Sequence, residues 1–214
     1  MRQSTFDFLG NLDTLLAVFI GAVLATGGAL LAEIIQERTN RKRLERDAAR
    51  FFGDILVSID RILDFAFRSQ TIGDKWGGVT IRLFKTALKE AEVYERTRER
   101  LFDISDMELR GRIHSHFLTE TFPIEAMIEN SEEIAAITDS LSGGIKLSKK
   151  ETEKLNVQAS ALHDAREVGL AALMREHAKT DELCKDIEKI AKVQFSDLAA
   201  QNGLQPPPSS SSPS

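Results

Sequence analysis

The feature that most constrains this chain is an apolar run from Thr14 to Ala32 that contains no charged side chain. An uncharged run of about 18 residues or more is long enough to cross the hydrocarbon core of a bilayer as a helix. Gly27 and Gly28 would weaken such a helix in water, but glycine is common in membrane helices, where the backbone must satisfy its own hydrogen bonds. The run therefore predicts a single transmembrane helix over residues 12–36.

Two other interpretations of the run stay open. A cleaved signal peptide is also apolar, and Gly27–Ala29 resembles a small-residue cleavage site. Against it, the preceding segment carries Asp7 and Asp13 beside Arg2, so it lacks the positive charge typical of a signal peptide. The third interpretation is a buried core helix of a soluble protein.

Basic side chains follow the run closely and predict its orientation. They are Arg38, Arg41, Lys42, Arg43, Arg46 and Arg50. Because positive charge favours the cytoplasmic side, we expect residues 1–11 to be a short extracytoplasmic N-terminus and the rest to lie in the cytoplasm. The same side chains suit anionic lipid headgroups. The compact design and short outer end favour a bacterial inner membrane.

Small residues recur along one face of the predicted membrane helix. Ala17, Gly21, Ala25 and Ala29 are spaced four apart, and Gly28 widens this face. Small side chains at this spacing allow two helices to approach closely in lipid. These five residues are our candidates for helix–helix association.

The remainder of the chain reads as an all-α domain over residues 37–201. Before the tail, Pro123 is the only proline, and apolar residues recur every three or four positions. The residues after 43 hold 23 basic and 29 acidic side chains, so we expect no nucleic-acid partner. Cys184 is the only cysteine, which excludes a disulfide framework within the chain and fits a reducing compartment. Residues 202–214, rich in proline and serine, predict a disordered tail.

The turn and cap signals divide this domain into an antiparallel bundle of four or five long helices, without clean coiled-coil heptads. We expect the membrane helix to continue to about residue 67, followed by a glycine-rich loop at 69–78 and helices at 79–102, 105–141 and 148–200. Pro123 either kinks the helix expected at 105–141 or begins a new one. The last is expected to be interrupted near 179–181. Ser105 with Glu108, and Ser148 with Glu151, each fit a capping box.

The histidines do not predict a metal site. His114 and His116 would point about 200° apart on a helix, and His163 and His177 are too far apart along one helix to converge. His163 and Glu167 have the i,i+4 spacing of half a site, but no partner pair is evident. We therefore expect structural or surface histidines.

Other reactive side chains also favour structural roles. Cys184 falls on an apolar face and reads as a small core residue. Trp76 lies in the glycine-rich loop, where it either packs back over the bundle or inserts into a membrane or partner. The acidic side chains Asp106, Glu108 and Glu120 read as caps and surface charge. No phosphate-binding or dinucleotide motif is present.

These observations favour a non-enzymatic, membrane-anchored module that binds lipid and either itself or another protein, without a cofactor or metal. A single-pass sensor whose bundle binds a small ligand is the alternative. A helical enzyme would require histidine, aspartate or glutamate side chains that converge from different helices.

Overall fold

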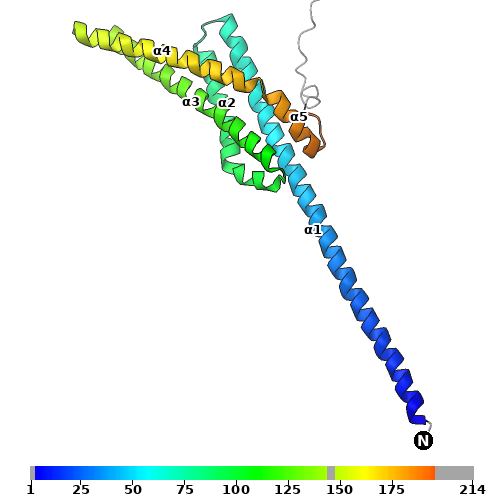
Figure 1. Ribbon diagram of the computed structural model, residues 1–214. Coiled ribbons are helices and arrows are strands. Elements are labelled where there is room, and N and C mark those ends of the chain that lie inside the picture. Colours follow the sequence, from blue (N-terminus) through cyan, green and yellow to red (C-terminus); the bar gives the residue numbers. More distant parts are fainter. Residues whose placement is uncertain (1–2, 144–147, 196–214) are drawn as a thin grey trace, which may run out of the picture. The chain divides into compact units, whose positions relative to one another are not determined.

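The computed structural model describes residues 3–143 and 148–195, and the side chains of residues 16–143 and 148–195. Every regular element among them is helical, so the predicted all-α class is confirmed. The elements are α1 (Gln3–Ile72), α2 (Gly78–Thr97), the 3₁₀ helix η1 (Arg98–Asp103), α3 (Met107–Ser142), α4 (Lys149–His177) and α5 (Thr180–Ala191) (Figure 1). The predicted tail, residues 202–214, lies outside the described residues.

The chain divides into two units, residues 1–44 and residues 45–214. α1 is a single unbroken helix, as the lack of proline between Leu30 and Phe67 predicts. It contains an 18-residue apolar window with a mean hydropathy of 2.1, and no part of that window is buried. By length and composition this helix could span a membrane, although a signal sequence would satisfy the same criteria.

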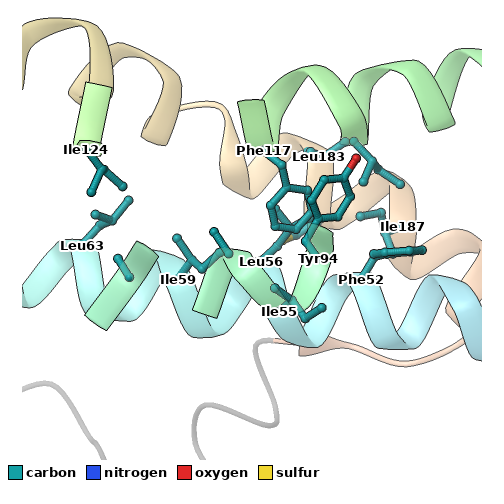
Figure 2. Packing of buried hydrophobic residues seen from close by; sticks show 14 of the residues in the cluster. Phe52, Ile55, Leu56, Ile59, Leu63, Tyr94, Phe117, Ile124, Leu183 and Ile187 are labelled. Atoms are coloured by element: carbon teal, nitrogen blue, oxygen red, sulfur yellow. The ribbon is translucent and has the colours of Figure 1, made fainter. Parts of the chain in front are cut away.

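The second unit is built around the apolar face of α1. Its buried residues are Phe52, Ile55, Leu56, Ile59 and Leu63, which are labelled in Figure 2, and Ala66. Tyr94 of α2 stacks on Phe117 of α3, with ring centroids 3.9 Å apart, and meets Phe52 edge-on at 5.9 Å. All five α-helices contribute to this cluster, because Leu170 and Leu173 of α4 and Leu183 and Ile187 of α5 also lie within it.

The loop between α1 and α2 is fixed by Trp76, which packs back over the bundle. Its indole N–H donates to Glu167 Oε1 at 3.1 Å, and the Arg166 guanidinium lies 4.3 Å from the ring centroid. Lys75 pairs with the same Glu167 at 2.5 Å. The first of the two interpretations of Trp76 is thus confirmed.

Helices α3 and α4 lie side by side (Figure 1). Pro123 lies inside α3, which runs on to Ser142 and is not divided into two helices there. The helices approach closely at Gly169, where a Cβ atom would lie 3.1 Å from Met127 Cγ. Met174 of α4 is 50% exposed.

One predicted cap is confirmed and the other is wrong. Ser148 and Glu151 form a complete capping box at the start of α4. At the start of α3, however, Asp106 is the cap, because its side chain accepts hydrogen bonds from the backbone N–H groups of Glu108 and Leu109. The predicted cap, Ser105, instead donates its backbone N–H to Glu45 Oε1 at 2.8 Å.

The last predicted helix is divided and shorter than expected. The interruption lies between His177 and Thr180, close to the predicted position. α5 ends at Ala191 rather than near residue 200, because Lys192 adopts a left-handed conformation with φ 56°. Arg50 Nε donates to the carbonyl of Ala191 at 3.0 Å, so a cation from α1 satisfies the negative end of α5.

Candidate functional site

The predicted association residues lie on the part of α1 in the first unit. Ala17, Gly21, Ala25, Gly28 and Ala29 are all exposed. A Cβ atom added at Gly21 or Gly28 would meet no atom within 4 Å. Packing among the described side chains therefore gives no reason for glycine at these two positions, whereas close approach of another helix would give one.

The predicted lipid-facing cations also lie on α1. Arg38, Arg41, Lys42, Arg43 and Arg46 are exposed. All five therefore have a solvent-accessible surface that a headgroup phosphate could reach, and each would contribute about 1 kcal/mol to attraction by an anionic leaflet.

The structure also brings together a group of ionisable side chains within the second unit. We call it the acidic cluster and define it as Asp60 and Asp64 of α1, His116 and Glu120 of α3, Glu176 and His177 of α4, and Asp181 of α5. Sequence reasoning did not predict this convergence, because the members come from four helices.

One half of the acidic cluster is centred on His116, which is only 3% exposed. Its Nδ1 lies 3.0 Å from Glu176 Oε1, and its Nε2 lies 3.4 Å from Glu120 Oε1 and 3.2 Å from the Thr180 hydroxyl. Burial alone would lower the pKa of His116, but the two carboxylates raise it above its ordinary value. The two carboxylates therefore stabilise the imidazolium form relative to that of a free histidine.

The other half is centred on His177, at the end of α4. Its Nδ1 lies 3.2 Å from Asp60 Oδ1, and its Nε2 lies 3.3 Å from Asp64 Oδ1. Burial raises the pKa of Asp60 to about 6, and repulsion from Asp64, Asp181 and Glu120 adds to this, whereas His177 opposes it. An uncompensated negative charge is therefore costly at this position.

One sequence interpretation is corrected by this arrangement. Glu120 is not surface charge, since it is only 3% exposed. The Nδ1 of His163 lies 2.7 Å from an Arg166 guanidinium nitrogen, and Glu167 binds the α1–α2 loop. The sequence places Asp60 about 100° around the helix from Ile59, at the edge of the apolar face of α1.

The geometry of the acidic cluster suits proton binding. Both ring nitrogens of His116 face side chains of the protein, and His116 and Glu176 also line an open cavity of about 460 Å³ together with Arg112 and Lys179. Within residues 16–143 and 148–195, no group of three or more His, Cys, Asp or Glu side chains is arranged to hold a metal ion. Cys184 is buried, and burial raises the pKa of its thiol to about 12, as expected for a core cysteine.

No protein-family model, curated protein or solved structure matches this chain. Its function therefore has to be argued from the exposed faces of α1, the acidic cluster and the surface of the bundle.

Proposed function

We propose that this protein is a non-enzymatic interaction module, anchored in the membrane by α1 and displaying an antiparallel helical bundle in the cytoplasm. In this proposal the small-residue face of α1 mediates self-association, and the bundle binds a protein partner. The basic side chains after the apolar window hold the cytoplasmic end against anionic headgroups.

The observation that carries this proposal is the double role of one helix. α1 contains the exposed apolar window, and further along it also supplies the core residues Ala48, Phe52, Leu56 and Leu63, each 0% exposed. A signal peptide is removed at maturation by cleavage at a small-residue site. The acidic Asp7 and Asp13 before the apolar run, and the basic side chains after it, support a retained anchor over a cleaved one.

A second candidate function, a single-pass sensor, is favoured by the acidic cluster. Asp60 and Asp64 lie on α1 itself, and the residues that hold them come from the junction of α4 and α5. A change in proton occupancy would therefore act on the helix that carries the anchor. The coupling would need two populated arrangements of the bundle.

Crosslinking in native membranes, followed by mass spectrometry of the captured chains, tests the first proposal. Capture of the chain by itself supports self-association, and capture of one defined foreign protein supports an interaction module. Recovery of only uncrosslinked monomer, at crosslinker concentrations that capture a known membrane dimer in the same sample, would contradict it.

A further inference from the structure

The corner between α2 and α3, where η1 turns the chain, contains an open cavity of about 660 Å³. This volume lies within the range of small-molecule sites in proteins. The lining residues that indicate a ligand site are Arg98, Leu101, Phe102, Met107, Arg110 and Gly111. Tyr94 and His114, joined by a 2.5 Å hydrogen bond, complete the lining.

The lining is apolar in its depth and at its rim. Leu101 is 8% exposed and belongs to the core, whereas Phe102 is 79% exposed and Met107 is 75% exposed. Two large apolar side chains this exposed beside a cavity indicate an interaction surface, because covering them removes apolar area from water. An apolar chain laid across Phe102 and Met107 would cover it.

Gly111 gives an independent indication of a ligand. It lies within α3, where glycine is less favourable than alanine, and an added Cβ atom would meet nothing within 4 Å. Packing within the described chain therefore does not explain it. The missing side chain does leave the helix backbone open to the cavity, so a ligand can approach closely there.

The polar part of the lining is cationic and contains no carboxylate. The Arg110 guanidinium lies 5.7 Å from the Phe102 ring centroid, and among the described residues it forms no ion pair. Arg98 pairs with Glu95, at 3.7 Å, in an exposed and therefore weak contact. Two arginines are consequently available to an anion, and guanidinium groups match carboxylate and phosphate geometry.

We propose that this corner binds an anionic amphiphile, which is a single acyl chain that ends in a carboxylate or phosphate. The chain covers Leu101, Phe102 and Met107 and passes over Gly111, while the headgroup binds Arg98 and Arg110. This proposal rests on the sensor alternative above and gives its ligand a chemical class.

The corner is also firmly attached to the beginning of the second unit. Ser105 donates its backbone N–H to Glu45, and the Arg100 guanidinium lies 4.4 Å from the Phe51 ring centroid. Glu45 lies within the basic segment of α1, between Arg43 and Arg46, and Phe51 directly follows Arg50. Ligand at this corner would therefore be recognised beside the part of α1 that enters the bundle core.

The test uses the full chain in nanodiscs of zwitterionic lipid, with a diazirine-bearing tetradecanoate as photo-crosslinking probe. Peptide mapping should place the label within residues 98–114. Unlabelled tetradecanoate should compete with the probe and reduce labelling. Tetradecanol, which has the chain without the charge, and acetate, which has the charge without the chain, should not reduce it.

Two substitutions separate the chain from the charge. Gly111→Leu fills the cavity with a better helix former and should lower labelling by about tenfold or more, while Gly111→Ala should retain most of it. Arg110→Gln should weaken competition by tetradecanoate by about tenfold, and Arg96→Gln, outside the lining, should have no effect. Circular dichroism would confirm that each variant is folded.

Equal labelling of the wild type and Gly111→Leu, or equal competition by tetradecanol and tetradecanoate, would overturn the proposal. Repeating the experiment in nanodiscs with anionic phospholipid distinguishes two sources of the ligand. Lost labelling assigns the site to bilayer lipid and retained labelling to a free acyl anion; both support the site. Membrane anchoring and self-association are measured without this probe, so their failure would be seen separately.

Discussion

Replacing Asp60 by Asn should stabilise the bundle, and the gain should depend on pH. The folded protein raises the pKa of Asp60 from 3.8 to about 6, chiefly because the carboxyl is buried. At 1.36 kcal/mol per pKa unit, holding the charge costs the folded state about 3 kcal/mol at pH 7.5. Asn removes this charge at nearly constant size, and its amide N–H groups can donate to neighbouring carboxylates.

The sign follows from proton linkage. Between pH 3.8 and about 6 the folded protein holds a proton on Asp60 that the unfolded chain has lost, so stability falls as pH rises through this window. The cost is complete above pH 6 and only about a third as large at pH 4.5. We therefore expect Asp60→Asn to gain about 1–3 kcal/mol at pH 7.5 and about 1 kcal/mol or less at pH 4.5.

Urea unfolding of the full chain in non-ionic detergent, followed by circular dichroism at both pH values, measures this difference. Asp64→Asn is the matched control, because Asp64 contacts the same histidine but its side chain is 50% exposed. We expect the control to change stability by less than about 0.5 kcal/mol. A loss of stability for Asp60→Asn at pH 7.5, or an equal gain at both pH values, would refute this reasoning.

Three further predictions follow from the helix contacts. In a Cys184→Ala background, Ala25→Cys should form a disulfide-linked dimer when membranes are oxidised. Val23→Cys, about 200° around the helix, should not form this dimer. Equal dimer yields for the two variants would contradict the proposal that the small-residue face mediates self-association. Asp106→Ala should lower the free energy of unfolding in urea by about 1 kcal/mol, and Ser105→Ala should lower it by less than about 0.5 kcal/mol. The reverse order would show that Asp106 is not the cap of α3. The wild-type bundle should also lose stability as pH rises above 6.5, because the raised folded pKa of His116 contributes stability that is complete below 6.5 and disappears as pH rises through the folded pKa. That loss should be missing from His116→Gln in the same unfolding series.

Local patterns predicted the elements of this fold well. The absence of proline and the apolar spacing predicted that α1 would continue into the bundle, and its face from Phe52 to Ala66 is buried as expected. The capping box at Ser148 was also readable, because both of its partners lie within four residues of each other.

Features that depend on contacts between helices could not be predicted from local sequence patterns. The cap of α3 was misassigned because Ser105 and Asp106 are both favoured cap residues and only Ser105 has a Glu three positions later; in the structure Ser105 instead donates its backbone N–H to Glu45. The acidic cluster requires the α4–α5 junction to meet α1 and α3, and sequence spacing does not reveal that meeting. The cavity at Gly111 likewise depends on how η1 turns the chain.

The retained anchor is the central claim, and the intact mass of the chain recovered from alkaline carbonate-washed membranes tests it most directly. We predict the full-length mass in the membrane pellet, because α1 remains uncleaved and spans the bilayer. A shorter chain that begins just after the Gly27–Ala29 segment, or a full-length chain released into the wash, would contradict the account.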